Sequence, residues 1–236
     1  FGEIEWLPDS SGFIYLCFPV VQKSDSNYKR HSFSVIHYLG DNPEKRTPIF
    51  GWDKTLEIAS DYYPKVKIGS SLDSYIIGYA ATSGIFYDSF IAKVTDVRLG
   101  KPKWKPFFKA SDKIYYNQGE IREQYFIYRR ATPEGNELCQ VEISDPNFDT
   151  PSILATGSRD SPITQFEVTK NHIYFVREKF GVEISIFEID GQQNITQLNP
   201  PFVPGYASFF GESVTHDNIG IGMDGWTSNY IRYCIN

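Results

Sequence analysis

The feature that most constrains the fold of this sequence is an apolar run that returns at a nearly constant spacing. The five runs end at Leu39, Val94, Ile143, Ile189 and Ile235, which gives steps of 55, 49, 46 and 46 residues. A period in the mid-forties is the length of one four-stranded blade of a β-propeller. The spacing therefore predicts an all-β chain of about five four-stranded blades.

Each repeat also contains segments that fit the other strands of a blade. Short apolar or alternating runs bounded by Gly, Pro, Asn, Asp and Ser are typical of strands, and no long segment keeps the 3.6-residue period of a helix. The expected first strands are 2–7, 65–69, 114–117, 163–168 and 206–210, and the expected second strands are 12–16, 74–78, 124–128, 172–176 and 218–222. The expected third strands are 33–39, 90–94, 138–143, 184–189 and 230–235, and the expected fourth strands are 47–50, 104–108, 152–155 and 195–198. The fifth repeat stops after its third strand, and the blade boundaries are predicted at 1–51, 52–109, 110–159, 160–203 and 204–236.

Two questions about this architecture stay open at the level of sequence. A β-sandwich also has short strands at intervals of about 8–12 residues, so one sandwich, or a tandem of two small ones, is the alternative fold. The long step that repeats favours the propeller. A propeller with uncovered end blades exposes apolar surface to water. Either the five blades close on themselves, or further blades complete the ring, or self-association or another chain covers the open blade faces.

The composition agrees with a soluble β protein and excludes several function classes. Aromatic residues make up 16% of the sequence, and they suit a pleated, half-buried surface. The formal net charge is −6 and basic residues occur only in short clusters, so we expect no nucleic-acid partner. No apolar stretch approaches the roughly 18–20 residues that span a bilayer, so we expect no membrane partner.

The cysteines and glycines give no cofactor motif. Cys17, Cys139 and Cys234 lie far apart in apolar runs with no CxxC or Cys/His spacing, which predicts buried free thiols, no disulfide framework and no metal site. Residues 220–225, Gly-Ile-Gly-Met-Asp-Gly, match the string GxGxxG, but no helical pattern follows them. These glycines are expected to thin a packed inner strand and to form a hairpin turn. We therefore expect no cofactor.

No catalytic group of residues is recognisable in the sequence. There is no Gly-x-Ser-x-Gly elbow that would hold a poised serine. The pair His216-Asp217 would suit a serine hydrolase only beside an activated serine, and none is identifiable. A sugar-active propeller enzyme would need convergent carboxylates, which the sequence does not place. The chain itself is expected to lack a catalytic triad.

Four segments carry motifs in a consistent order. Residues 6–15 read Trp-Leu-Pro-Asp-Ser-Ser-Gly-Phe-Ile-Tyr, and residues 31–40 read His-Ser-Phe-Ser-Val-Ile-His-Tyr-Leu-Gly. Residues 72–77 read Leu-Asp-Ser-Tyr-Ile-Ile, and residues 227–233 read Thr-Ser-Asn-Tyr-Ile-Arg-Tyr. In this order they resemble two blade openings, a His-x-x-Tyr-x-His-x-Leu-Gly segment and the last propeller strand of prolyl oligopeptidase-family serine peptidases. The resemblance spans nearly the whole chain.

The resemblance implies a seven-bladed, unclasped propeller beside an α/β-hydrolase domain of the same parent chain. That domain would carry the Ser-Asp-His triad and cut short peptides after proline, and this chain would be the later five blades. In the family, a loop between a second and a third strand supplies an Arg and a Cys near the substrate. The matching residues here, 80–87, read Ala-Ala-Thr-Ser-Gly-Ile-Phe-Tyr and contain neither. Thr82 and Tyr87, two polar residues of that stretch, are the candidates for substrate contact.

The functional expectation is a non-catalytic, substrate-gating propeller segment of a prolyl oligopeptidase-like serine endopeptidase. Its partners would be the hydrolase domain and a short peptide substrate, and closure would keep water from the reacting groups. The alternative is a stand-alone propeller that binds a protein or peptide partner through its loops. Phe1 begins in a strand-like pattern with no signal peptide or initiating Met, so we expect a piece of a longer protein. A cytoplasmic location is favoured, with a periplasmic or secreted one left open.

Overall fold

The structure is a computed structural model that describes residues 4–19, 22–42, 44–53, 56–70, 74–211 and 214–235. Within these residues the chain forms four antiparallel sheets of four strands and one of three, and neighbouring strands in a sheet are consecutive in sequence. Helical structure in the same ranges is limited to the short helix α1 (Val94–Arg98) and the 3-10 turn η1 (Ala110–Asp112). The described part contains no helix with the length and hydrophobicity needed to cross a bilayer. The chain divides into two compact units, Phe1–Asp112 and Lys113–Asn236.

The first unit contains two sheets, each a simple antiparallel meander. The strands of the first sheet are β1 (Glu5–Trp6), β2 (Gly12–Cys17), β3 (Phe33–Tyr38) and β4 (Thr47–Gly51). The strands of the second sheet are β5 (Tyr63–Ile68), β6 (Tyr75–Ala81), β7 (Asp88–Lys93) and β8 (Lys105–Pro106). In the β2–β3 pair the register places Gly12 opposite Tyr38 and Cys17 opposite Phe33.

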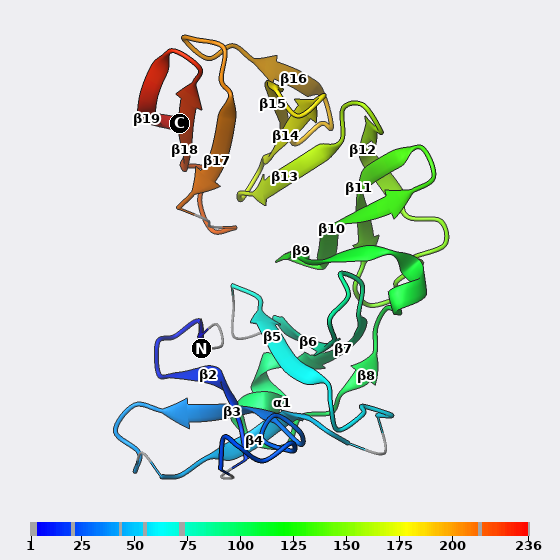
Figure 1. The fold of residues 1–236 in the computed structure, drawn as a ribbon, viewed down its shortest axis with the longest axis vertical. Helices are drawn as coiled ribbons and strands as arrows, with labels where there is room; N and C mark the ends of the chain where they lie inside the picture. The colour runs from blue at the N-terminus through cyan, green and yellow to red at the C-terminus, as the bar shows by residue number, and fades with distance from the viewer. Residues whose placement is uncertain are drawn as a thin grey trace. The chain divides into compact units, whose positions relative to one another are not determined.

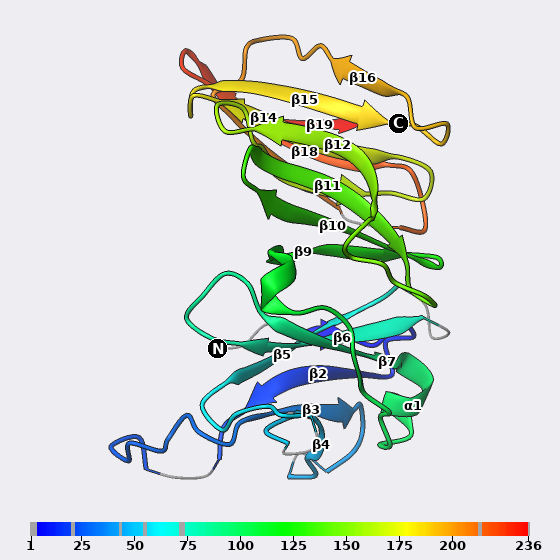
Figure 2. The same ribbon diagram turned by 90° about the vertical axis from the view of Figure 1, so that its right-hand side faces the viewer.

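The two sheets of the first unit pack on each other through β5. This strand contacts β1, β2, β3 and β4, and Figure 2 shows β5 and β6 lying over β2 and β3. The buried cluster that results includes Ile14 and Ile36 of one sheet and Ile76 of the other. Burying an isoleucine of this kind stabilises the fold by about 1.5–3 kcal/mol. Helix α1 adds Val94 and Val97 to the same cluster.

The second unit contains three sheets of the same kind. The strands of its first sheet are β9 (Ile114–Arg122), β10 (Tyr125–Thr132), β11 (Gly135–Glu142) and β12 (Ser152–Ser158). The strands of its second sheet are β13 (Ile163–Val168), β14 (Ile173–Lys179), β15 (Glu183–Ile189) and β16 (Ile195–Leu198). The strands of its third sheet are β17 (Tyr206–Phe210), β18 (Ile219–Gly225) and β19 (Ser228–Ile235). Figure 1 shows these sheets in green, yellow and orange to red.

The sheets of the second unit bury their faces against one another. Strand β13 contacts β9, β11 and β12 of the sheet before it and β17 of the sheet after it. One buried cluster joins Leu138 to Ile163 and Phe175, and a second joins Val176 to Ile221. Each sheet therefore packs face to face with the next in the sequence, which is the stacking expected of consecutive propeller blades.

Polar side chains also cross from sheet to sheet in the second unit. The carboxamide of Asn136, on β11, donates to the carbonyl of Ile163 and accepts from its N–H, both at 2.9 Å. The Nη1 of Arg129 donates to the same carbonyl, and burial lowers the pKa of Arg129 to about 10. The Nε2 of Gln165 donates to the carbonyl of Ala207 at 3.0 Å. These bonds join side chains of one sheet to backbone groups of the next, and so they hold neighbouring sheets in register.

Most strand predictions are confirmed. The predicted strands 163–168, 195–198 and 206–210 coincide with β13, β16 and β17, and every predicted second and third strand overlaps an observed one. The glycine-rich string at 220–225 lies in β18, the middle strand of its sheet. A Cβ on Gly220 would stand 2.1 Å from the Phe210 ring, so the glycine leaves the space that this ring occupies. A GxGxxG string binds a dinucleotide where a helix follows it, and here the strand β19 follows.

Two predicted strands in the first unit are wrong in detail. The third strand was expected at 90–94, but β7 is Asp88–Lys93 and Val94 begins α1. The fourth strand was expected at 104–108, but only Lys105–Pro106 pairs as a strand. Proline has no N–H to donate to a ladder, and the indole of Trp104 instead donates to the carbonyl of Ile49 at 2.6 Å.

The prediction of three buried thiols is correct only in part. All three cysteines are free, but Cys139 is buried, Cys17 is half-buried and Cys234 is exposed. Cys234 lies on β19, the outer strand of the three-stranded sheet, where an apolar run does not imply burial on both faces. Gly2, at the start of a predicted first strand, and the motif residues Leu72 and Asp73 lie outside the described residues.

Candidate functional site

The loop that joins β6 to β7 holds both residues proposed from sequence for substrate contact. Tyr87 is 8% exposed, and its hydroxyl donates inward to the carbonyls of Gly84 at 2.8 Å and Thr82 at 3.2 Å. Burial raises the pKa of the Tyr87 phenol, so it stays a donor at neutral pH. Thr82 is exposed, and its Oγ1 accepts from the N–H of Gly84 at 3.2 Å. The structure thus brings the two residues together, with Tyr87 supporting the loop from inside and Thr82 on its surface.

The end of this loop is fixed to the chain that follows β8. The carboxylate of Asp88 accepts from the N–H of Ala110 at 2.8 Å, which ties the start of β7 to η1. The hydroxyl of Ser89 accepts from the N–H of Phe108 at 3.0 Å. Ile85 stands at the tip of the loop and is 59% exposed. The loop therefore presents a small, firmly held surface with an isoleucine and a threonine hydroxyl facing water.

In the second unit, apolar side chains are exposed where the second strand of a sheet turns into the third. Phe180, in the turn after β14, is 65% exposed, and Trp226, in the turn after β18, is 76% exposed. Val182, in the same turn as Phe180, is 44% exposed, and Val203, in the connection between β16 and β17, is 75% exposed. Single exposed apolar residues are ordinary, whereas a large contiguous apolar patch is a feature of interaction surfaces.

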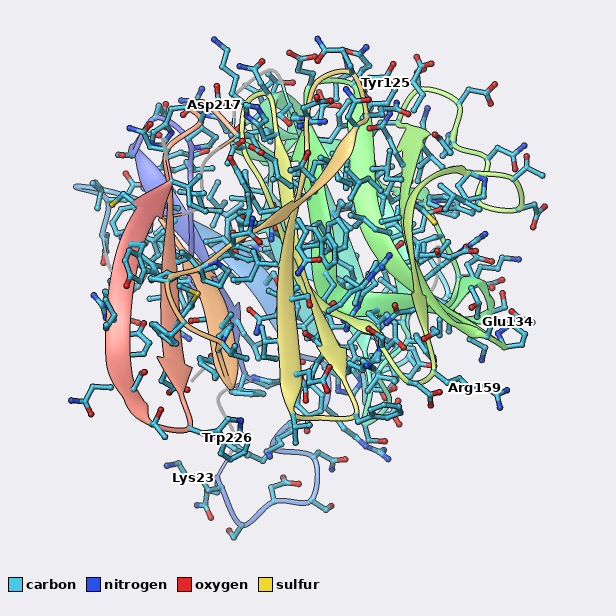
Figure 3. The ribbon with its side chains drawn as sticks, turned by 90° about the horizontal axis from the view of Figure 1, so that it is seen from above. Lys23, Tyr125, Glu134, Arg159, Asp217 and Trp226 are labelled. Carbon is cyan, nitrogen blue, oxygen red and sulfur yellow. The ribbon has the colours of Figure 1, made fainter. Side chains whose placement is uncertain are left out.

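These turns lie at the same end of the second unit. The bond from Gln165 to Ala207 joins the beginnings of β13 and β17, so both strands start at one end. Tyr206 pairs with Asp224, and Ile163 pairs with Arg177, which places the turns after β14 and β18 at that end too. Figure 3 shows Glu134, Arg159 and Trp226 along one edge and Tyr125 and Asp217 along the opposite edge. We call these the Trp226 end and the Asp217 end of the second unit.

The Asp217 end is polar and tightly bonded. The carboxylate of Asp217 accepts from the backbone N–H and the side-chain Nδ2 of Asn171, both at 2.7 Å, and from the Thr169 hydroxyl at 3.2 Å. Burial opposes ionisation, but these bonds and one from His172 outweigh it and hold the pKa of Asp217 below its usual value. His216, the neighbour considered from sequence as a catalytic partner, contacts Thr215 through Nδ1 at 3.5 Å. Asp217 therefore acts as a cross-sheet anchor, and its bonds do not resemble those of a hydrolase triad.

The geometry offers little for metal or small-molecule chemistry. Among the residues that the structure describes, no group of three or more His, Cys, Asp or Glu side chains could hold a metal ion. A cavity between β2, β3 and β5, lined by residues such as Leu16, Ser34 and Pro64, has a volume of about 20 Å³. That volume holds about one water molecule and no substrate.

Sequence reasoning singled out the β6–β7 loop and did not single out the Trp226 end. Thr82 and Tyr87 stay candidates for substrate contact, now with different roles for their side chains. The exposed residues Phe180, Val203 and Trp226 were not singled out, although large apolar residues within turn segments are a visible signal. Their exposure depends on how each turn is directed, which the sequence pattern does not specify.

Comparison with known proteins gives matches only at the level of structure. No family model matches the sequence, and no curated protein matches it. A solved prolyl endopeptidase, from a study of inter-domain dynamics in catalysis and specificity, superposes with a TM-score of 0.79 at 13% identity, covering 100% of this chain and 33% of that one. Prolyl oligopeptidase B from Galerina marginata, bound to a 25mer macrocyclization substrate, gives a TM-score of 0.80 at 15% identity, covering 100% of this chain and 32% of that one.

A third solved protein extends the same likeness. Oligopeptidase B from Trypanosoma brucei, with covalently bound antipain, superposes with a TM-score of 0.69 at 11% identity, covering 98% of this chain and 32% of that one. The chain thus spans about a third of the length of the structures it matches. At such low identity the likeness is one of fold. The sheets of this chain are therefore β-propeller blades of the kind found in prolyl oligopeptidases and oligopeptidase B.

Proposed function

We propose that this chain is the non-catalytic, substrate-gating propeller segment of a prolyl oligopeptidase-like serine endopeptidase that acts on short peptides. The observation that carries the proposal is the structural match, which covers the whole chain and about a third of each peptidase. The order of the sequence motifs supports the same family. In this proposal the blades run 1–51, 52–109, 110–159, 160–203 and 204–236 within a seven-bladed, unclasped ring, and a hydrolase domain of the same parent chain carries the triad.

The Trp226 end is the surface that we assign to contact with the hydrolase domain. Trp226 and Val203 are more than two-thirds exposed at 76% and 75%, and an indole of this exposure gains much by docking on an apolar partner surface. In the first unit, the loop between β6 and β7 has the same place in its sheet as the turns after β14 and β18. We assign substrate contact to the exposed Thr82 there, with Tyr87 holding the loop in shape.

The test uses the full-length parent protein and two substrates that share one cleavage sequence. One substrate is a short chromogenic peptide ending in Gly-Pro, and the other carries the same sequence within a folded protein. Trp226→Ala should weaken the docked state, so cleavage of the folded substrate should rise by about fivefold or more relative to the peptide. Ile195→Ala is the matched control, because Ile195 is 48% exposed on the edge strand β16.

Three results would contradict the proposal. The purified 236-residue chain should not hydrolyse the chromogenic peptide, and turnover that survives careful purification would show that it is an enzyme in itself. If Trp226→Ala and Ile195→Ala cleave the folded substrate and the short peptide in the same ratio, the Trp226 end does not dock on the hydrolase domain. Thr82→Val should raise KM for the short peptide, and an unchanged KM would remove Thr82 from the site.

A second candidate function is a stand-alone propeller that binds a protein or peptide. The exposed apolar groups of the Trp226 end, Phe180 and Trp226 among them, would serve such a partner equally well. The two functions predict different coding sequences beyond Asn236. A Gly-x-Ser-x-Gly elbow followed by the Asp and His of a triad is expected for the peptidase, and its absence favours the binding module.

A further inference from the structure

The connection between β15 and β16 leads into the one Asn-x-Ser/Thr tripeptide of the sequence, Asn194-Ile195-Thr196. This tripeptide, with any residue except proline in the middle, is the acceptor sequence for an N-linked glycan. Because such tripeptides also occur by chance, the place of Asn194 in the fold decides whether it can hold a glycan. All three residues are exposed, and the exposed fraction of Ile195 is 48%.

Asn194 closes a short turn that begins at Asp190. The carboxylate of Asp190 accepts from the backbone N–H of Asn194 and from its side-chain Nδ2, both at 2.9 Å. The N–H of Asp190 donates to the carbonyl of Asn194 at 3.1 Å, and Ile189 pairs with Ile195 where β16 begins. A glycan on Nδ2 replaces one of its two hydrogens, and the other can still donate to Asp190. The turn is therefore compatible with a glycan on Asn194.

The turn lies at the Asp217 end of the second unit, beside the outer strand of its sheet. Strand β15 starts after the turn that holds Phe180 and Val182, which is at the Trp226 end, so β15 finishes at the opposite end. In the strand order β13-β14-β15-β16 of the described residues, β16 is outermost. A glycan on Asn194 therefore projects beside the outer edge of this sheet and leaves the Trp226 end uncovered.

The outer strand β16 is less guarded than the other fourth strands. An outer strand presents unpaired N–H and C=O groups to other chains, and proteins guard it with prolines, lysines or bulges. Strand β8 is Lys105–Pro106, β4 contains Pro48, and β12 pairs with β11 through a register shift. Apart from its short length, β16 has none of these guards, since it reads Ile-Thr-Gln-Leu and its four residues pair with β15 in continuous register.

We propose that Asn194 is the acceptor of an N-linked glycan that covers the outer edge of β16. In the transfer, Nδ2 forms a bond to C1 of an oligosaccharide, the bond from C1 to the pyrophosphate of its lipid carrier breaks, and the amide loses a proton to the transferase. The required hydroxyl residue is Thr196, which is exposed. The site is used where the chain enters a secretory pathway, a location that the sequence leaves open. This proposal does not depend on the proposed peptidase role.

The first experiment adds a cleavable secretion signal to the 236-residue chain and expresses it in cultured eukaryotic cells. The chain should carry a glycan that peptide N-glycosidase F removes, and the removal should convert Asn194 to aspartate, which peptide mass spectrometry locates. Asn194→Gln and Thr196→Ala should abolish the glycan, whereas Thr196→Ser should keep it. Asn199→Gln is the matched control and should keep the glycan, because Asn199 is exposed but lies outside the tripeptide.

Each result of this experiment decides for or against the acceptor site. A chain with unmodified Asn194 would overturn the proposal, and so would a glycan that remains on the Asn194→Gln chain. Since the glycan is attached during translocation, before the chain folds, chains that stay inside the cells give the same answer if a variant is not secreted.

The second experiment tests whether the glycan covers β16. The glycosylated chain and its Thr196→Ala variant, which keeps Asn194 and its bonds to Asp190, are concentrated, and light scattering measures their self-association. The variant should associate more by about twofold or more, and adding Ile195→Lys to it should reverse the increase because a lysine then guards the edge. Equal association with and without the glycan, or an added lysine that changes nothing, would overturn the covering role.

Discussion

The buried carboxamide of Asn136 gives the sharpest test of how adjacent sheets are joined. Asn136 is 4% exposed, and it makes a donor and an acceptor bond to Ile163 at 2.9 Å each. Asn136→Ala would leave the N–H of Ile163 buried without its acceptor, which costs about 1–3 kcal/mol. The carbonyl of Ile163 would still accept from the guanidinium of Arg129, so losing the Asn136 donor to this carbonyl costs little stability. The space left by the carboxamide adds about 1 kcal/mol, for a total of about 2–4 kcal/mol.

Thermal and urea unfolding of the 236-residue chain would measure this loss. A destabilisation of about 3 kcal/mol lowers the Tm of a chain of this size by about 6–12 °C. Asn229→Ala, at an exposed position on β19, is the control and should stay within about 0.5 kcal/mol of the unaltered chain.

Asn136→Asp separates the two bonds. It keeps an acceptor for the Ile163 N–H but places a buried carboxylate against a carbonyl oxygen, so it should be at least as destabilising as alanine at pH 7. Since protonation turns that oxygen into a donor, stability should recover as the pH falls toward 4. An Asn136→Ala chain as stable as the Asn229→Ala control, or an Asn136→Asp chain unaffected at pH 7, would refute the reasoning.

Two further predictions follow from packing and burial. Gly220→Ala should cost about 1–3 kcal/mol in urea unfolding because its Cβ would stand 2.1 Å from the Phe210 ring, while Gly191→Ala, whose nearest neighbour is 3.9 Å away, should cost little. A small effect at both glycines would show that the Phe210 ring moves aside freely. Iodoacetamide at pH 8 should label the exposed Cys234 in the native chain and label Cys139 only after denaturation, because burial raises the pKa of Cys139 to about 12. Mass spectrometry of tryptic peptides checks this, and native labelling of Cys139 at the rate of Cys234 would contradict it.

The repeat and the strands within it could be predicted from sequence because their signal is local. A strand buried on both faces, such as β14, appears as a continuous apolar run, and the step to the next such run is set by the length of a blade. The failures also have local causes. Val94 continues an apolar run, yet the chain turns there into α1, and the lysines and prolines that follow form only the short pair of β8.

The candidate site was less predictable because it depends on the direction of individual side chains. Sequence reasoning treated Tyr87 as a polar group available to a substrate, but its hydroxyl closes the loop on itself through Gly84. It considered the pair His216-Asp217, whereas Asp217 lies against His172, which is 45 positions earlier in the sequence. An anchor of that kind is not visible in a local pattern, because each partner alone is an ordinary turn residue.

The spacing of these anchors nevertheless reflects the repeat. The bonds between sheets join residues 42 positions apart for Gln165 and Ala207, 46 for Asn171 and Asp217, and 50 for Arg122 and His172. Each is close to one repeat length, so a polar side chain near a strand end reaches the backbone or turn of the neighbouring blade. In the second unit the bonds from Asn171 and Arg122 gather at the Asp217 end, while the Trp226 end exposes apolar groups. The bonds of Asn136 and Gln165 lie at the Trp226 end, so cross-sheet bonds contribute to stability at both ends of these sheets. Trp226→Ala can nevertheless test the proposed docking without unfolding the blades, because the indole is 76% exposed and a substitution at such a surface position costs little stability.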